Sequence, residues 1–275
     1  MSDDWLLGKQ TEYLNQYNPE LLTPIPRKLT RDELGLPHEL PFKGCDIWNL
    51  WELSWLNKKG KPVVASGVLS YDCTSPNIVE SKSLKLYLNS LNQKTFDDNN
   101  RVRETIIKDL SEIIGSTVKL ELHSKPVEAP LLVYPKAECI DDIDLEIKSY
   151  EYNPEILKDI FDANGEHTKE QLISHLLKTN CRVTNQPDWA SIIIDYQGRA
   201  LNRAALLEYL ISFRGSQDFH EPSAERIFMD IMNYAGPESL SVYCRYTRRG
   251  GIDINPYRTT KEDWGHLDNS RVWRQ

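Results

Sequence analysis

The sequence predicts an α+β protein made of two antiparallel sheets, each with two helices packed on one face. Three observations lead to this prediction. The two halves of the 275-residue chain repeat one another, strand-like and helix-like segments alternate within each half, and the strands flank a pair of helices. This order is typical of antiparallel sheets that have one covered face. We therefore expect two tandem domains, at residues 1–150 and 151–275.

Four short segments of the first half return in the same order in the second half. The matched pairs are QYNPELL (16–22) with EYNPEIL (151–157), KPVVASGVLSY (61–71) with QPDWASIIIDY (186–196), SKSLKLYLNSL (81–91) with RAALLEYLISF (203–213), and IIGSTVKLEL (113–122) with YAGPESLSVY (234–243). Each match is weak alone, but four in one order indicate a duplicated unit. Its period is longer than that of solenoid repeats.

In the first half, residues 63–71 alternate loosely and predict a strand. Residues 100–114 place their apolar side chains on one helical face, and Gly115 offers the positive φ of a helix end. Residues 117–122 resume a period of two and predict a strand. The segment 83–91 fits neither period cleanly, so a short helix and a strand end both stay open.

In the second half, Pro222 suits the first turn of a helix that Gly236 ends. Residues 240–246 then predict a strand, so each half has the order β-β-α-α-β-β. A further helix is expected over 168–178, because Thr168 and Gln171 form a capping box ahead of an apolar segment. This helix would lead the chain to Cys181.

The composition is that of an ordinary globular protein, with 40% hydrophobic and 27% charged residues. A net charge of −8 argues against direct nucleic-acid binding, so an anionic cofactor would need a local basic pocket. No apolar run approaches the ~20 residues that span a bilayer. The first residues, MSDDWLLGKQ, do not resemble a signal peptide. We expect no membrane association and a cytoplasmic location.

The cysteines and histidines show no metal-ligand spacing. The five cysteines are Cys45, Cys73, Cys139, Cys181 and Cys244. No CxxC pair occurs, and the six histidines include no HxH. We therefore expect free thiols, no disulfide framework and no metal site.

The segment NCRVTNQPDWA brings a cysteine and an acid to the two sides of a predicted turn. Asp188 lies seven positions after Cys181 (188 − 181 = 7). A thiolate is a nucleophile, and a buried carboxyl is able to donate a proton. A buried thiol and a turn-capping aspartate explain the same residues. Cys45 and Glu52 have the same separation (52 − 45 = 7), so spacing alone does not decide.

Two further segments carry candidate binding residues. His220 and Glu221 lie at a predicted helix start, where a carboxylate either favours the helix dipole or accepts two hydrogen bonds from a guanidine-like ring edge. In the first half, Glu80, Lys82 and Lys85 are either a solvated charged face or part of a site.

The segment YTRRGGIDINP places Arg248 and Arg249 before two glycines. Glycines let the backbone approach a ligand closely, and guanidinium groups suit phosphate. This segment is a candidate for binding a phosphorylated cofactor, with an exposed basic turn as the alternative.

Together, VESKSLKLYL, NCRVTNQPDWAS, SFR…FHEP and YTRRGGIDINP resemble the signature of the NADPH-dependent 7-cyano-7-deazaguanine reductases of queuosine biosynthesis. The resemblance covers nearly the whole chain and is to the long, two-module form. It implies tandem tunnelling-fold (T-fold) modules. Residues 1–150 would carry the ESK motif, and residues 151–275 the catalytic cysteine and aspartate with the His-Glu substrate motif.

The resemblance also implies a reaction and its residues. The family reduces a nitrile to an aminomethyl group through a covalent cysteine thioimidate, with NADPH as cofactor and a small 7-deazaguanine nitrile as substrate. It implies Cys181, Asp188 and His220 as catalytic residues, Val79, Glu80, Ser81, His220 and Glu221 as substrate contacts, and Ser81, Lys82, Arg249 and Gly250 as NADPH contacts. Cys45 then falls in the module without the nucleophile. Because family sites form at junctions between modules and subunits, a homodimer is implied.

Three other functions were weighed against this one. A cyclohydrolase or pterin enzyme of the same superfamily would need a metal site, which the histidine spacing does not offer. A ligand-binding paralogue without activity conflicts with the intact Cys181, Asp188 and Glu221. An enzyme that acts on tRNA itself conflicts with the acidic net charge.

Overall fold

The computed structural model describes residues 16–125, 136–161, 165–263 and 267–275. Contacts divide the chain into two compact units. Unit 1 comprises Met1–Leu36, Cys45–Glu128 and Arg248–Asp253, and unit 2 comprises Pro37–Gly44, Ala129–Thr247 and Ile254–Gln275. These units are defined by the contacts between residues, whereas the predicted boundary near residue 150 comes from the sequence repeat. The division into two duplicated modules at that boundary stays a prediction.

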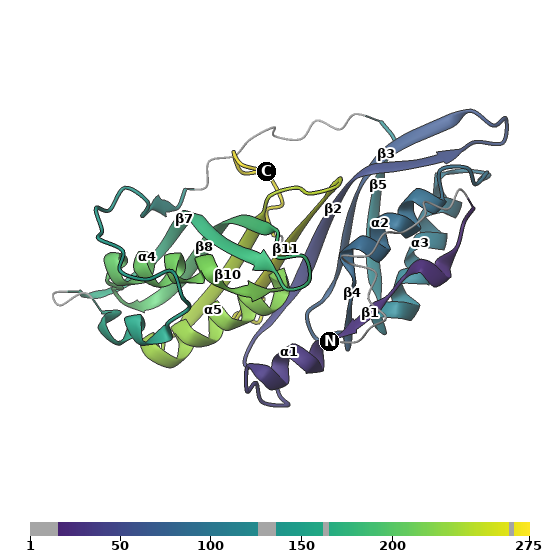
Figure 1. Cartoon of the computed structure of the whole chain (residues 1–275). Coiled ribbons are helices and arrows are strands. Elements are labelled where there is room, and N and C mark those ends of the chain that lie inside the picture. Colours follow the sequence, from purple (N-terminus) through teal and green to yellow (C-terminus); the bar gives the residue numbers. More distant parts are fainter. Residues whose placement is uncertain (1–15, 126–135, 162–164, 264–266) are drawn as a thin grey trace. The chain divides into compact units, whose positions relative to one another are not determined.

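Unit 1 has a three-stranded antiparallel sheet and a pair of helices. The strands, in sheet order, are β5 (Val118–His123), β3 (Pro62–Asp72) and β2 (Lys43–Leu56). The helices α2 (Ser81–Ser90) and α3 (Asn99–Ile114) lie together on one side of these strands (Figure 1). The short elements are a 3-10 helix (Pro19–Leu21), β1 (Pro24–Pro26), α1 (Arg27–Glu33) and β4 (Asn77–Val79), with β1 and β4 paired.

Unit 2 repeats this arrangement and extends it. Its hairpin is β7 (His167–Cys181) and β8 (Pro187–Arg199), followed by α4 (Arg203–Ser212), α5 (His220–Ala235), β10 (Ser239–Tyr246) and β11 (Ile252–Thr259). Two-residue strands β6 (Glu138–Cys139) and β9 (Gln217–Asp218) pair in parallel with β7. Two 3-10 helices, Pro154–Asp159 and Phe213–Gly215, complete the unit. The fold is therefore mixed, with helices on sheets that are mainly antiparallel.

Most of the predicted elements are confirmed. The strands expected at 63–71, 117–122 and 240–246 are β3, β5 and β10. The two amphipathic helices are α3 and α5. Gly115 and Gly236 end them with φ of 72° and 50°, as their positions predicted. The segment left open between helix and strand is the helix α2.

The helix expected over 168–178 is wrong, because this segment belongs to the long strand β7. A β-bulge explains the misleading pattern. Ser174 pairs with Ile192 and Leu177 with Ala190, so two residues of β7 lie opposite the single residue Ser191. The extra residue shifts the inward positions by one and breaks the period of two. Apolar residues then recur at a spacing that resembles a helix.

The bulge has a counterpart in unit 1. Leu50 pairs with Gly67 and Leu53 with Ala65, so two residues of β2 again lie opposite one, Ser66. Ala65 and Ala190 occupy the same place in the sequence repeat. The two hairpins thus share an irregularity that the amphipathic pattern alone does not require.

The repeat also extends to a buried polar cluster in each unit. In unit 1 the hydroxyls of Tyr17 and Tyr87 both donate to Asp109 Oδ2 at 2.6 Å. In unit 2 the hydroxyls of Tyr152 and Tyr209 donate to Asp230 Oδ2 at 2.8 and 2.6 Å. Each cluster ties the segment before the first strand to both helices. The duplication predicted from weak sequence matches therefore includes matched side-chain contacts.

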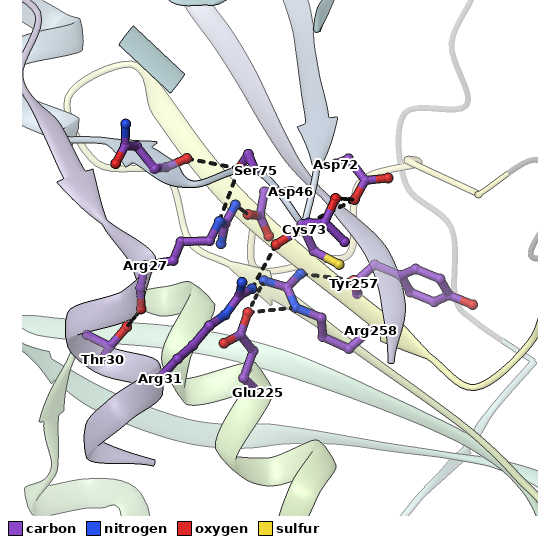
Figure 2. A network of polar contacts seen from close by, with 12 residues as sticks. Arg27, Thr30, Arg31, Asp46, Asp72, Cys73, Ser75, Glu225, Tyr257 and Arg258 are labelled. Carbon is purple, nitrogen blue, oxygen red and sulfur yellow. Dashed lines mark hydrogen bonds and ion pairs between the residues drawn. The ribbon is translucent and has the colours of Figure 1, made fainter. Parts of the chain in front are cut away.

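Buried ion pairs hold secondary elements within each unit (Figure 2). In unit 1 the Arg27 guanidinium lies against Asp46 and donates to Ser75 Oγ at 3.1 Å, which fastens α1 to β2. In unit 2 Arg258 on β11 donates to Glu225 Oε1 on α5 from Nε at 3.1 Å and Nη2 at 2.9 Å. Removing one partner of such a pair leaves a buried charge without compensation, at a cost of about 3–5 kcal/mol.

In the described part of the chain, no helix is both long and apolar enough to cross a bilayer.

The tyrosine–aspartate clusters lead to a stability prediction. Asp109→Ala leaves the hydroxyl of the fully buried Tyr87 without its acceptor. We expect the free energy of unfolding to fall by about 2 kcal/mol in urea denaturation. Asp32→Ala is the control, because Asp32 is exposed and its ion pair is with Lys28 of the same helix. It is expected to change the free energy by less than about 0.5 kcal/mol. Equal losses in both variants would contradict the assigned role of Asp109.

Candidate active site

Cys181 is the last residue of β7, where the chain turns into β8. Its backbone N donates to Gln186 O at 2.8 Å, and Asn185 N donates to Cys181 O at 2.9 Å. Asn185 has φ of 57°, a left-handed conformation that asparagine tolerates better than most residues. The turn predicted from the Asn-Gln-Pro segment is therefore present. It holds Cys181 at the end of a paired strand with only 4% of the residue exposed.

The strand register places Asp188 on the same sheet face as Cys181. Thr179 pairs with Asp188, and side chains directly opposite each other in an antiparallel pair share a face. Cys181 lies two residues after Thr179, so its side chain points the same way. The two side chains are then diagonal neighbours, whose separation is about 7–8 Å. Asp188 is 8% exposed.

The pair with the same spacing in unit 1 is arranged differently. Cys45 and Glu52 both lie along the single strand β2, with no turn between them. At about 3.3 Å per residue, seven residues of strand separate their Cα atoms by roughly 23 Å. The structure therefore distinguishes two pairs that the sequence spacing did not.

His220 completes the cluster from the helix side. It is the first residue of α5, and its Nε2 lies 3.4 Å from Asp188 Oδ2. The imidazole stacks on the Tyr246 ring, with centroids 3.8 Å apart and an angle of 29° between the planes. Tyr246 is at the end of β10, pairs with Ala190, and is 1% exposed. Sequence reasoning missed Tyr246, although it belongs to the YTRRGG segment.

Glu221, the second residue of α5, is 2% exposed. A carboxylate in the first turn of a helix is favoured by the helix dipole. The same helix is anchored one turn later by the ion pair between Glu225 and Arg258 (Figure 2). This ion pair joins α5 to β11 one turn after His220 and Glu221, and so helps to position these two residues over the sheet.

Asp218 borders the cluster, whereas Trp189 follows Asp188 on β8 and points to the opposite sheet face. Two guanidinium groups, those of Arg214 and Arg274, stack over the Trp189 ring at 5.2 Å each. Asp218 is the parallel-strand partner of Cys181, and its Oδ1 accepts from Phe219 N at 2.9 Å. Burial raises the pKa of Asp218, and Arg226 opposes this shift. No sequence pattern marked Asp218, because its place depends on the two-residue strand β9.

The predicted residues of unit 1 gather at the start of α2. Val79 ends β4, Glu80 follows, and Ser81 and Lys82 open the helix. Glu80 is 1% exposed and caps the helix with both carboxylate oxygens. Oε1 accepts from Lys82 N at 2.8 Å and Oε2 from Ser83 N at 2.7 Å. Burial raises the pKa of Glu80, although these two backbone donors and the nearby lysines lower it in part.

Asn202 holds the equivalent cap position in unit 2. Its Oδ1 accepts from the backbone N of Ala204 and Ala205 at 3.1 and 3.2 Å. The backbone conformations also match, with φ and ψ of −67° and 128° at Glu80 and −68° and 105° at Asn202. A shorter side chain therefore suffices for the cap. The helix cap alone therefore does not explain why the longer side chain of glutamate occupies position 80.

The Arg-Arg-Gly-Gly segment forms a tight turn in unit 1. Gly250 and Gly251 have φ of 59° and 73°, which explains the two glycines. Arg248 stacks over the Trp51 ring at 4.6 Å, and a Cβ at Gly250 would lie 3.1 Å from the Lys85 side chain. A cavity of about 320 Å³ is lined in part by Lys85, Gly250 and Gly251.

The predicted residues divide between the two units. Cys181, Asp188, His220 and Glu221 belong to unit 2. The other group belongs to unit 1 and consists of Val79, Glu80, Ser81, Lys82, Arg249 and Gly250. Within unit 2, a thiol, a carboxyl and an imidazole share one largely buried site. This combination suits a nucleophile with a proton donor beside it.

The two caps predict how substitutions of Glu80 affect stability. Glu80→Asn should keep the cap, because Asn202 fills it at the equivalent position, and the free energy of unfolding should change by less than about 0.5 kcal/mol. Glu80→Ala leaves two backbone donors unsatisfied and should cost about 1 kcal/mol. Urea denaturation measures both variants. If Glu80→Asn is as unstable as Glu80→Ala, the equivalence of the caps is wrong.

Comparisons with known proteins agree with the motifs. A family model described as nitrile reductase, 7-cyano-7-deazaguanine-reductase N-term, matches residues 13–122, and one described as QueF-like protein matches residues 187–264. A relative from Desulfotalea psychrophila (strain LSv54 / DSM 12343), the NADPH-dependent 7-cyano-7-deazaguanine reductase, is 48% identical over 270 residues. The match covers 98% of this chain and 96% of the relative.

Among solved structures, the apo crystal structure of the archaeosine synthase QueF-Like is 15% identical, with a TM-score of 0.29. This match covers 36% of this chain and 94% of that one. The resemblance found in the motifs is confirmed by the relative that matches almost end to end. The chain belongs to the family of the NADPH-dependent 7-cyano-7-deazaguanine reductases.

Proposed function

We propose that this protein reduces the nitrile 7-cyano-7-deazaguanine to 7-aminomethyl-7-deazaguanine, with two NADPH consumed for each amine formed. The proposal is supported by 48% identity to a reductase of that name over 98% of the chain. One structural observation carries it. Cys181 and Asp188 lie on one sheet face, largely buried, with His220 in contact with the acid.

Cys181 is the nucleophile in this proposal. A nitrile carbon accepts hydride poorly, and addition of the thiol turns it into a thioimidate whose C=N bond is more reactive once protonated. The sulfur bonds to carbon, and the proton goes to nitrogen. Covalent catalysis of this kind divides one difficult step into easier ones.

Asp188 supplies the proton to the nitrile nitrogen. In a nitrile the nitrogen lies beyond the carbon that sulfur attacks. Because the carboxyl lies diagonally across from the thiol, it suits an acid that protonates the nitrogen and not the sulfur. His220, 3.4 Å from the carboxyl and stacked on Tyr246, holds Asp188 in place and relays protons to it.

NADPH, when bound, supplies a hydride for each of the two reductions, thioimidate to hemithioaminal and imine to amine. The residues of unit 1 fit such an anionic cofactor, because Lys82, Lys85, Arg248 and Arg249 belong to one compact unit and Lys85 packs against the Gly250 turn. Ser81, Lys82, Arg249 and Gly250 would hold it. Between the reductions Cys181 leaves the hemithioaminal as thiolate, and the buried site protects the imine from water.

Two buried carboxylates would recognise the deazaguanine ring. Glu221 accepts two parallel hydrogen bonds from the guanine-like edge, in the manner of carboxylate–guanidine pairs. Glu80, beside Val79 and Ser81, contacts the base as well. A carboxylate has about four acceptor sites, so the two backbone donors at Glu80 leave room for ring N–H groups. This second role explains why glutamate and not asparagine occupies the cap in unit 1.

The finer architecture belongs to the same proposal. Two tandem T-fold modules, divided near residue 150, are supported by the matched hairpins, bulges and tyrosine–aspartate clusters of the two units. Assembly as a homodimer and a cytoplasmic location stay predictions of the sequence.

The covalent step is tested by absorbance. Protein mixed with 7-cyano-7-deazaguanine and no NADPH should develop a thioimidate band and gain the mass of the nitrile. Cys181→Ala should lose both signals, and Cys45→Ala should keep both, because Cys45 lies at the end of β2 away from the hairpin turn and belongs to the unit that lacks His220 and Glu221. The reverse pattern would overturn the assignment. With NADPH added, two molecules should be oxidised for each amine.

The raised pKa of Glu80 predicts a pH dependence of substrate binding. The ionised carboxylate is the acceptor, so affinity should fall when the pH is lowered from neutral through a pKa above the usual 4.5. Glu80→Asn should bind substrate weakly at neutral pH. It should also lack the part of the fall in affinity at low pH, the acid limb of the profile, that protonation of Glu80 causes. Calorimetric titration at several pH values measures both.

Unfolding does not account for the acid limb. A raised pKa means that the protonated carboxyl favours the folded state, so the stability it contributes is full below the usual pKa and is lost as the pH rises through the folded pKa. Glu20→Gln, an exposed change in the same unit, should leave the profile unaltered. An unchanged profile in Glu80→Asn would remove Glu80 from the binding site.

A further inference from the structure

The bulge in β7 aims a histidine at a group outside the catalytic cluster. His175 is one of the two β7 residues opposite Ser191, and β-bulges commonly redirect a side chain. Asp141, just after β6, lies beside the bulge. Its Oδ1 accepts from Ser174 Oγ at 2.6 Å and its Oδ2 from His175 N at 2.9 Å. These bonds fix the carboxylate next to the imidazole.

Cys139 is the third member of this group. The ligand atoms of Cys139, Asp141 and His175 all lie within 4.8 Å of one another. We propose that these three side chains form a binding site for a divalent transition cation of the zinc class, distinct from the Cys181 site. Thiolate, imidazole and carboxylate are the ligands that Zn²⁺ takes, and three protein ligands with one water complete a tetrahedral site.

The surroundings of the histidine fit this role. Its Nδ1 is 2.7 Å from Ser191 Oγ, which orients the ring and leaves Nε2 for a cation. A hydrogen bond to the second ring nitrogen is the usual support of a metal-bound histidine. The Asp141 oxygens each accept one hydrogen bond and keep further lone pairs.

The local charges both favour and oppose a cation. The carboxylates of Asp141 and Asp142 place negative charge close to the Cys139 thiol. A bound cation would offset that negative charge. Arg274 opposes it, since its guanidinium donates to His175 O at 2.6 Å. Two acids against one arginine leave a negative balance.

The geometry needs only a small adjustment. Ligand atoms around tetrahedral Zn²⁺ are about 3.3–3.8 Å apart, given bonds of about 2.0–2.3 Å. The three ligand atoms lie within 4.8 Å of one another, so the distances between them must shorten when the cation binds. Cys139 is exposed at a two-residue edge strand and is free to make most of this movement. The cation would then fasten β6 to the bulge of β7.

Cobalt binding tests the proposal directly. Full-length protein, stripped with chelator and titrated with Co²⁺, should show thiolate-to-cobalt charge-transfer absorption, and Zn²⁺ should abolish it by displacement. Cys139→Ala should lose the band, and Asp141→Asn should weaken Co²⁺ binding at least tenfold. Zn²⁺ should raise the unfolding temperature of the wild type but not of Cys139→Ala. Circular dichroism checks that the variants are folded.

Two matched variants separate this site from other ligands. Cys181→Ala removes the proposed catalytic thiol of unit 2, and His167→Ala removes an exposed histidine of the same strand β7. Both should keep the cobalt band and the zinc affinity. The proposal is overturned if the wild type shows no band, if Cys139→Ala keeps it, or if Cys181→Ala loses it. None of these readouts depends on the reductase reaction.

Discussion

The antiparallel pairing of β7 with β8 is the constraint on which the proposed chemistry depends. The pairing of Thr179 with Asp188 makes the thiol of Cys181 and the carboxyl of Asp188 share a face, and the turn closed by Gln186 keeps them near one another. A buried ion pair holds the helix α5 to β11, and the first residue of this helix, His220, contacts Asp188. The proposed nucleophile and its proposed acid are thus positioned by backbone hydrogen bonds, which cost no side-chain ordering when substrate arrives.

The two units share an architecture and carry different residues at the proposed binding positions. Both units keep the hairpin, the helix pair and the tyrosine–aspartate cluster, which are the features that maintain a core. They differ at the helix cap, Glu80 in one and Asn202 in the other. They also differ in where a cysteine and an acid meet. In unit 2 Cys181 and Asp188 lie on the two sides of the β7–β8 turn, whereas in unit 1 Cys45 pairs with Asp72 at the end of β2 away from its turn. The core-forming positions match between the units, and the proposed site positions differ.

The sequence predicted the parts of the fold that follow from local periodicity. Helices α3 and α5 were found because an apolar face ends at a glycine with positive φ. Strand β7 was missed because its bulge depends on pairing with β8, which no local window contains. The family motifs located Cys181, Asp188, His220 and Glu221. Tyr246 and Asp218 escaped notice, and so did the group of Cys139, Asp141 and His175. Their proximity arises from strand pairing across long separations in the chain.

The bulge in β7 also divides the strand into two stretches, and the rule for which residue numbers face inward differs between them. Before it, Leu172 and Ser174 point inward, and after it Leu177, Thr179 and Cys181 do, an odd step apart. The bulge thus keeps both stretches on one sheet face, although the positions that face inward change from even to odd numbers. The matching bulge in β2 makes the same change at the equivalent place in unit 1.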